Sequence, residues 1–391
     1  MPEKLVIALG ILVIQALEAF LFIRGLKIPG RWGLWVVALF ILFNLPLPYV
    51  LWLQSGARQP STPIAALAVR PFFAWQFNWL CFLFFLAPLI ILGRAGAWLF
   101  GWEVIINVLR WLICGLAAAG ALLTVFGLVN TVKPPEIKTI EIALPGLPPD
   151  QDGLRVAQLS DLHVAWWNSR AEFQRIGRMV ADLRPDLLVI TGDMVDHNPD
   201  YVEVVAGGLE KVRPRLGRYA VIGNHDIYTG REAVARRMEK NGFKMLRGEC
   251  VSLKEKGAAV SLAGYDDSGK SWTSGDPAEN MVPTALAQCD PDLPVILLAH
   301  RPPRFEKIEN SRISLALAGQ THGGQFRLPF DGPGLADLTF PHASGLYQEN
   351  GKSLYVTHGT GTVGWPFRLF CPPEITLIVL RSSPLPRPAE N

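Results

Sequence analysis

Seven residues with side chains able to bind a metal ion or move a proton stand where short apolar segments end. They are Asp161 and His163 after LRVAQLS, Asp193 in DLLVITGD, Asn224 and His225 in RYAVIGNHD, His300 in PVILLAH, and His322 after ISLALAG. Each residue taken singly is also compatible with a turn, since Asp, Asn and Gly are common turn residues. Five separate segments that end in Asp, Asn or His are difficult to explain by turns alone. We therefore predict that these side chains meet in one site.

The donor types in this set favour divalent cations. Carboxylates, imidazoles and an amide oxygen suit Mn, Fe or Zn, whereas a structural zinc site usually needs clustered cysteines. Cys250, Cys289 and Cys371 are widely spaced, and their spacing leaves open whether one disulfide or only free thiols are present. One carboxylate stands between two groups of donors. This arrangement favours a pair of ions about 3.5–4 Å apart, which clamps a phosphate and activates a water.

The segments that must position these residues alternate between strand-like and helix-like patterns. Apolar β-branched runs are separated early in the domain by amphipathic segments near 168–183, 201–212 and 230–241, and later runs are mostly strand-like. This order predicts an α/β domain of layered sheets faced by helices. Ligands bind such sheets where the strand ends converge on one edge. A Pro-rich segment, residues 132–153, is predicted to be a linker that runs into the first strand.

Residues 1–131 predict a bundle of four transmembrane helices. Four stretches, near 4–23, 33–53, 72–92 and 104–129, are long and apolar enough to cross about 30 Å of hydrocarbon. The soluble domain is predicted over 154–382, with a disordered tail at 383–391. The first loop carries Arg24, Lys27 and Arg31, which favours that loop in the cytoplasm and the rear domain outside it. The sequence thus predicts a multi-pass protein of the cell (inner) membrane with an extracytoplasmic rear domain.

Polar residues inside the predicted spans have two interpretations. They mark either a transport path or the interior of the bundle. We favour the interior, because so few ionisable groups leave little from which to build a relay. The residues concerned are Gln15, Glu18, Asn44, Gln76, Asn78 and Arg110.

Five motifs in order resemble those of the calcineurin-like metallophosphoesterases: SDLH, TGDMVD, GNHD, LLAH and GQTHGGQ. The ending GTGTVGWPFRLFCPPEITLIVL resembles the membrane-associated bacterial branch of that family, and the resemblance covers roughly residues 136–380. It implies two β-sheets sandwiched by helices, and a site in which two divalent ions (Mn, Fe, Zn or Mg) hydrolyse phosphate esters through a metal-bridged hydroxide.

The resemblance also implies a role for each matching residue. Seven are implied as metal ligands: Asp161, His163 and His322 for the first ion, Asn224, His300 and Gln320 for the second, and Asp193 between them. His225 is implied to stay off the ions and either to stabilise transition-state charge or to protonate the leaving oxygen. Asp226 is implied to orient His225 through a hydrogen bond.

Gln320 departs from the family pattern, which has histidine at this position. A glutamine carbonyl binds divalent ions, but it is a neutral and weaker donor than imidazole for Mn, Fe or Zn. The second ion is therefore expected to be held loosely, to depend on substrate phosphate, or to be a harder metal such as Mg or Mn. His358, at the end of SLYVTH, is either a substitute ligand or a plain loop histidine, and we favour the latter.

Together these observations predict a membrane-anchored metallophosphoesterase that cleaves phosphate mono- or diesters. The anchor favours lipid or lipid-linked substrates, and two aromatic stretches, 165–170 and 364–370, either face the membrane or pack in the core. The alternatives are a UDP-diacylglucosamine pyrophosphohydrolase-like enzyme of lipid A synthesis, a degenerate phosphate-binding module, and a transporter with a regulatory domain. Residues 134–391 are slightly acidic with no basic stripe, so no nucleic-acid partner is predicted. The sequence does not indicate the oligomeric state.

Overall fold

The computed structural model describes residues 2–56, 58–270, 280–309, 311–330, 332–364 and 366–382. The chain divides into two compact units, which are described separately: residues 1–132 with 365–367, and residues 133–364 with 368–391. The predicted disordered tail at 383–391 lies outside the described residues.

The first unit is helical, as the apolar composition of its segments predicts. Its helices are α1 (Pro2–Gly25), α2 (Gly30–Asn44), α3 (Leu47–Gln54), α4 (Thr62–Ile64), α5 (Arg70–Cys81), α6 (Ala87–Phe100) and α7 (Glu103–Val132). Two π-helical turns, Ala65–Val69 and Phe82–Leu86, join α4 to α5 and α5 to α6. Four continuous stretches are long and apolar enough to cross a membrane: Val6–Gly25, Gly30–Gln54, Thr62–Phe100 and Glu103–Val132.

Polar side chains of the helical unit bind one another. The Asn44 amide donates to Gln15 Oε1 at 3.2 Å, Gln76 donates to Asn44 Oδ1 at 3.0 Å, and Gln15 donates to Gln76. Such bonds between helices stabilise packing in an apolar environment, where an unpaired amide is costly. Three of the polar residues in the predicted spans therefore join α1, α2 and α5.

The second unit contains two six-stranded sheets. The first has the order β1 (Glu136–Ala143), β12 (Glu374–Arg381), β2 (Leu154–Leu159), β3 (Leu187–Thr191), β4 (Arg218–Val221) and β5 (Lys244–Met245). The second has the order β10 (Gly345–Glu349), β11 (Lys352–Val356), β9 (Ile313–Ala318), β8 (Val295–Leu298), β7 (Ser261–Gly264) and β6 (Glu249–Ser252). The α/β class and the two layered sheets predicted from the sequence are confirmed.

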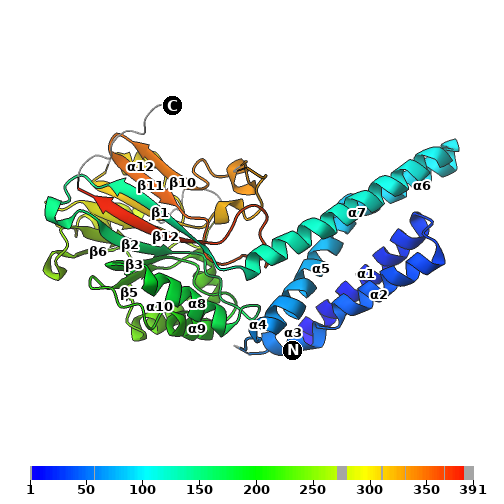
Figure 1. Ribbon diagram of the computed structural model, residues 1–391, viewed down its shortest axis with the longest axis horizontal. Coiled ribbons are helices and arrows are strands. Elements are labelled where there is room, and N and C mark those ends of the chain that lie inside the picture. The colour runs from blue at the N-terminus through cyan, green and yellow to red at the C-terminus, as the bar shows by residue number, and fades with distance from the viewer. Residues whose placement is uncertain are drawn as a thin grey trace. The chain divides into compact units, whose positions relative to one another are not determined.

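Helices cover the outer faces of the two sheets (Figure 1). The helices α8 (Arg170–Asp182), α9 (Val202–Gly208) and α10 (Asn224–Lys240) lie on the first sheet, and α11 (Val282–Leu286) and α12 (Phe305–Glu309) lie on the second. Val156 and Val189 of the first sheet share one buried core with Leu298 and Leu317 of the second. Because both faces of the central strands are covered, these strands have the continuous apolar runs seen in the sequence.

Parallel pairing brings the functional ends of the strands together. In the first sheet β2, β3 and β4 are parallel, and in the second β7, β8, β9 and β11 are parallel. The carboxyl ends of strands in each set therefore lie at a common edge, and the predicted site residues follow directly after them.

A disulfide joins Cys250 to Cys289, which resolves the alternative that the sequence left open. It connects strand β6 to the segment that follows α11. Among the described cysteines, Cys81, Cys114 and Cys371 are free.

Candidate metal centre

The predicted ligands converge in a buried site where strands of both sheets end. Asp161 and His163 follow β2, Asp193 follows β3, Asn224 begins α10 after β4, His300 follows β8, and Gln320 and His322 follow β9. Except for the partly exposed Gln320, these side chains are almost fully buried. Carboxylates buried in this way need compensating positive charge.

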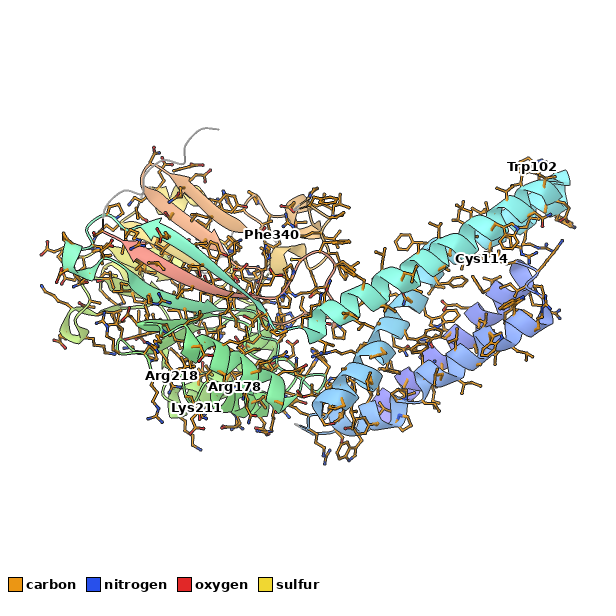
Figure 2. All side chains as sticks on the ribbon, viewed as in Figure 1. Trp102, Cys114, Arg178, Lys211, Arg218 and Phe340 are labelled. Atoms are coloured by element: carbon orange, nitrogen blue, oxygen red, sulfur yellow. A yellow bond between two sulfur atoms is a disulfide. The ribbon has the colours of Figure 1, made fainter. Side chains whose placement is uncertain are left out.

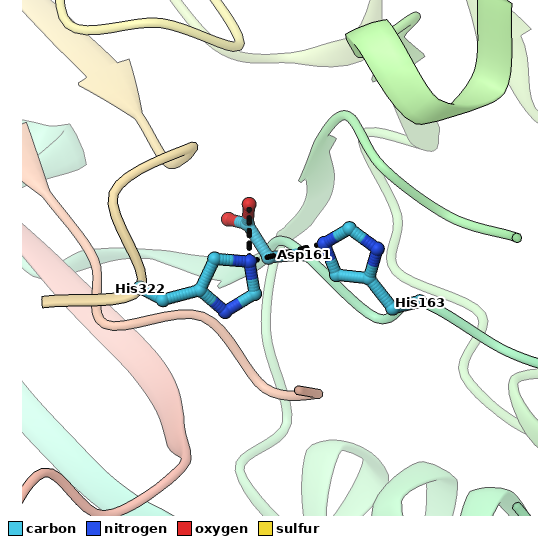
Figure 3. Close-up of side chains that lie close together, drawn as sticks. All are labelled: Asp161, His163 and His322. Carbon is cyan, nitrogen blue, oxygen red and sulfur yellow. Dashed lines mark hydrogen bonds and ion pairs between the residues drawn. The ribbon is translucent and has the colours of Figure 1, made fainter. Parts of the chain in front are cut away.

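One group of donors consists of Asp161, His163 and His322 (Figure 3). His163 Nε2 lies 3.0 Å from His322 Nε2, and His322 Nε2 lies 3.4 Å from Asp161 Oδ1. These three residues can each offer one donor atom to a common cation. Two imidazoles with facing Nε2 atoms and a carboxylate fit a transition-metal ion.

Asp193 lies between this group and a second one. Its Oδ2 atom is 3.4 Å from His163 Nε2 and 3.3 Å from His300 Nε2. His300 Nε2 in turn lies 3.1 Å from Asn224 Oδ1. The same carboxylate oxygen therefore faces imidazoles of both groups, which is the geometry expected of a bridging ligand.

Hydrogen bonds to the outer ring nitrogens orient two of the imidazoles. His300 Nδ1 donates to the carbonyl of Thr191 at 2.8 Å, and His163 Nδ1 faces the carboxylate of Asp196 at 3.2 Å. When a ring is neutral and its proton lies on Nδ1, it turns an unprotonated Nε2 toward the site. Such bonds fix the tautomer that a cation requires.

The backbone at the site is strained. Asp161, His163, Asp193, Gln320 and His322 all have φ between 45° and 69°, in the left-handed region. Residues other than glycine seldom adopt this conformation, and when they do so they often mark functional sites. Five of the seven predicted ligands share it, so the loops hold these side chains in place at a conformational cost.

Two glycines permit the close approach of neighbouring loops. A Cβ atom on Gly223 would lie 2.2 Å from Asp193 Oδ1, and one on Gly319 would lie 2.3 Å from Asp161 Oδ2. Any side chain at these positions would displace a predicted ligand. The glycines of GNHD and AGQTH are thus explained by the space that the carboxylates occupy.

Electrostatics show how strongly the site demands positive charge. Burial lowers the pKa of His163 and His300, but nearby carboxylates, chiefly Asp196 for the first and Asp193 for the second, outweigh it. The result is a pKa of about 9 for His163 and about 10 for His300. Burial raises the pKa of Asp193, but His300 and His163 outweigh this and hold it below its usual range. A bound cation would supply this charge and leave the imidazoles neutral.

His225 stands beside the ligands with a different environment. Its side chain is 26% exposed, and its Nδ1 lies 2.7 Å from Asp196 Oδ1. Its backbone N–H donates to Asp193 Oδ1 at 2.8 Å. A carboxylate accepts from Nδ1–H, so Nε2 of His225 is left to face a substrate.

Asp226 has a contact pattern that differs from the sequence prediction. Its carboxylate accepts from the backbone N–H groups of Gly223 at 3.0 Å, Met194 at 2.9 Å and Val195 at 3.2 Å. The carboxylate that pairs with His225 is that of Asp196. Asp226 caps the start of α10 and ties it to the loop after β3, because helix N-termini offer unpaired N–H donors.

Comparisons with known proteins agree with this geometry. A sequence model described as calcineurin-like phosphoesterase matches residues 154–328. The metallophosphoesterase YkuE of Bacillus subtilis is 31% identical over 283 residues, which cover 69% of this chain and 95% of YkuE. The chain belongs to the calcineurin-like metallophosphoesterases. This family consists of phosphoester hydrolases. That the chain belongs to it explains why the five motifs occur in this order.

A Danio rerio relative, named as a transmembrane protein with a metallophosphoesterase domain, is 38% identical over 272 residues, which cover 67% of this chain. The chain spans about three fifths of that relative, 61% of its length. A solved dimetal phosphatase from Danio rerio is more distant, with 11% identity, a TM-score of 0.37, and coverage of 53% of this chain and 88% of that one.

Gln320 stands where this metallophosphoesterase departs from the family's usual histidine. Its backbone N–H donates to the Asp161 carboxylate at 3.0 Å, and its side-chain Oε1 is buried without a hydrogen-bond partner. A buried acceptor of this kind usually has a partner. A bound cation would provide one, and Asp161, Asp193 and His300 can each offer one donor atom to a common ion, so the residues present fit a second ion.

Two charged residues beside the site have no counterpart in the sequence prediction. Asp196 is the last residue of the GDMVD motif, and its spacing from Asp193 is the signal that could have revealed it. Arg368 is fully buried, donates to the carbonyls of His358 and Gly361, and lies 3.1 Å from His322 Nδ1. The sequence around residue 368 does not predict the contact with His322, because the two residues lie 46 positions apart.

His358 faces the carboxylate of Glu374. Its Nδ1 is 3.7 Å from Glu374 Oε2, and Glu374 Oε1 accepts from Tyr355, Thr357 and Thr376. Trp166 and Trp167, from the first aromatic stretch, are buried. Of the two interpretations given for that stretch, packing in the core is the one observed.

Proposed function

We propose that this chain is a membrane-anchored, metal-dependent phosphohydrolase for phosphate mono- or diesters that are part of lipids or linked to them. The observation that carries the proposal is the buried convergence of six donors, Asp161, His163, Asp193, Asn224, His300 and His322, with the more exposed His225 beside them. Five of the seven predicted ligands have a left-handed backbone, a strained conformation that clusters at functional sites.

The donors divide into two sets that share one carboxylate. Asp161, His163 and His322 would hold one divalent ion. Asn224, His300 and Gln320 would hold the other, with Asp193 between the two. When bound, the ions supply positive charge for the phosphate oxygens and lower the pKa of the attacking water. The chain itself supplies the positioning, through rings fixed by Thr191 and Asp196 and through glycines that let the loops meet.

His225 would act on the leaving group. Its Nδ1–H donates to Asp196, so a proton on Nε2 points away from that carboxylate toward the exposed side. Proton transfer from Nε2 to the leaving oxygen would follow, and it typically contributes 10²–10⁴-fold to such reactions.

The Cys250–Cys289 disulfide supports an extracytoplasmic location for this domain. Disulfides persist in oxidising compartments and are rare where thiols are kept reduced. The charge of the first loop favours the same side. This orientation disfavours the pyrophosphohydrolase of lipid A synthesis, which needs a cytoplasmic site.

Hydrolysis by the full chain in detergent micelles tests the proposal. Metal-stripped protein is given Mn, Mg, Fe or Zn and assayed on bis-p-nitrophenyl phosphate and p-nitrophenyl phosphate, beside Asp193→Ala and His225→Ala. We expect turnover that requires metal, is lost with Asp193→Ala, and falls with His225→Ala while metal content is kept. Folded wild-type protein without turnover on either ester with any of the four metals would contradict the proposal.

A further inference from the structure

Exposed apolar side chains of the second unit gather in one segment next to the metal centre. Among its described residues, eight large apolar side chains are exposed, and four of them are Leu328, Phe330, Leu335 and Leu338. Phe330 is 100% exposed and Leu338 81%. All four lie in residues 326–341, here termed the apolar loop, which begins four residues after His322. Clustered exposed apolar residues commonly mark a surface that binds something.

The backbone of the apolar loop is held in place by hydrogen bonds. The Arg327 guanidinium donates to Gly332 O at 3.1 Å, Gly323 O at 3.3 Å and Ser344 Oγ at 2.9 Å. The Leu335 N–H donates to Phe326 O at 3.1 Å. Figure 2 labels Phe340 of this loop, in the pale orange part of the second unit. The exposed side chains are thus presented by an ordered segment that is anchored at the loop of His322.

The short connection between the two units indicates what the apolar loop contacts. Helix α7 ends at Val132 and β1 begins at Glu136, so the second unit starts at most roughly 14 Å of chain from the last apolar helix. The apolar loop is also tied to the start of this unit: Arg327 N–H donates to Leu369 O at 3.0 Å, and four residues further on Pro373 O accepts from the N–H of Glu136, the first residue of β1, at 2.8 Å. The bilayer that the helices are able to span is therefore within reach of this loop.

We propose that the apolar loop inserts Leu328, Phe330, Leu335 and Leu338 into the lipid surface of the membrane that anchors the chain. Insertion at the boundary between headgroups and acyl chains would hold the loop of Gln320 and His322 at the level of lipid phosphates. Burial of apolar side chains at this boundary is the force that holds interfacial segments. The consequence for lipid substrates rests on the proposed function, whereas the insertion itself does not.

Crosslinking of the full chain in nanodiscs tests the insertion. The nanodiscs contain phosphatidylethanolamine and phosphatidylglycerol, and Phe330 is replaced by the photocrosslinker p-benzoylphenylalanine. The control carries the same group at Glu255, which is exposed between β6 and β7, across the second sheet from β10. We expect lipid adducts at position 330 and not at 255. Crosslinking at 330 to a second copy, to another protein, or to nothing would overturn the proposal.

Kinetics separate this inference from the proposed function. The variant Phe330→Ser/Leu338→Ser alters two exposed positions outside the catalytic machinery. We expect it to hydrolyse soluble bis-p-nitrophenyl phosphate at the wild-type rate, and to hydrolyse a phosphodiester presented in the nanodisc at least about fivefold more slowly. Equal loss on both substrates, or no loss on either, would contradict the inference. A wild-type chain inactive on both would refute the proposed function and leave the crosslinking result to decide the insertion.

Discussion

Replacement of Gln320 by leucine separates its ligand role from a role in packing. The Gln320 Oε1 atom is buried and has no hydrogen-bond partner. Such an atom costs about 1–3 kcal/mol when nothing binds it. Leucine has a similar size and removes that cost, so the metal-free chain is expected to become more stable by about 1–3 kcal/mol. A cation that uses this oxygen would lose the same amount of binding free energy, which corresponds to roughly a fivefold to 150-fold weaker affinity.

The assay needs both the metal-free and the metal-bound protein. Thermal unfolding of the metal-stripped full chain should show a rise of about 2–4 °C for each kcal/mol in the second unit. Isothermal titration with Mn²⁺ should show one ion bound as in the wild type and the second bound more weakly. Gln320→His is the matched control, and it should tighten the second ion, since imidazole is the stronger donor. If Gln320→Leu lowers metal-free stability and leaves both Mn²⁺ affinities unchanged, the ligand assignment is refuted.

Three further predictions follow from the contacts of the site. Asp196→Asn should lower turnover by roughly 10²-fold or more even at saturating metal, because His225 loses the carboxylate that orients it, and it should weaken the first ion roughly 10–100-fold, because His163 loses the same partner; steady-state kinetics with a metal assay check this. Mn²⁺ binding at pH 7.5 should release about two protons, since His163 and His300 have pKa values of about 9 and 10 without metal and bind it neutral; titration heats in buffers of different ionisation enthalpy measure them. The free energy of unfolding should decrease as the pH is lowered, because burial lowers the pKa of His358 to about 4.

The sign of the His358 effect follows from its depressed pKa. The unfolded chain takes up this proton below about pH 6.5, and the folded chain does so only below about pH 4. The stability due to the neutral ring is therefore complete above pH 6.5 and falls by about 2 kcal/mol by pH 5. His358→Gln should flatten the dependence of the unfolding temperature on pH over this range. If the unfolding temperature of His358→Gln depends on pH as strongly as that of the wild type, the role given to His358 is wrong. If the heat of Mn²⁺ binding does not depend on the buffer, the predicted proton release is wrong.

The sequence was sufficient to predict the class of the fold and the meeting of the ligands. Parallel strands with both faces covered are continuously apolar, so their ends stand out wherever an Asp or His follows, as at Asp193 and His300. The glycines beside these residues also carry a signal, because close loops exclude a Cβ atom. The four apolar stretches predict helices by length and composition alone.

Contacts between distant positions were not predictable in the same way. The sequence assigned the contact with the His225 ring to Asp226, its neighbour in the chain, whereas Asp196, 29 positions away, makes it. Only the geometry shows that the backbone N–H groups of Gly223, at the start of α10, and of Met194, after β3, occupy Asp226. The pairing of Cys250 with Cys289, and the approach of Arg368 to His322, depend on how the two sheets place segments that are far apart in sequence.

The most direct test of a binuclear hydrolase is the number of ions bound per chain. Metal-stripped full chain is equilibrated with increasing free Mn²⁺, and bound metal is measured by mass spectrometry alongside hydrolysis of bis-p-nitrophenyl phosphate. We predict two ions per chain in the wild type, with turnover rising as the second site fills, and loss of both binding and turnover in Asp193→Ala. Turnover that is complete with one ion, or unchanged metal content in Asp193→Ala, would contradict a pair of ions bridged by this carboxylate.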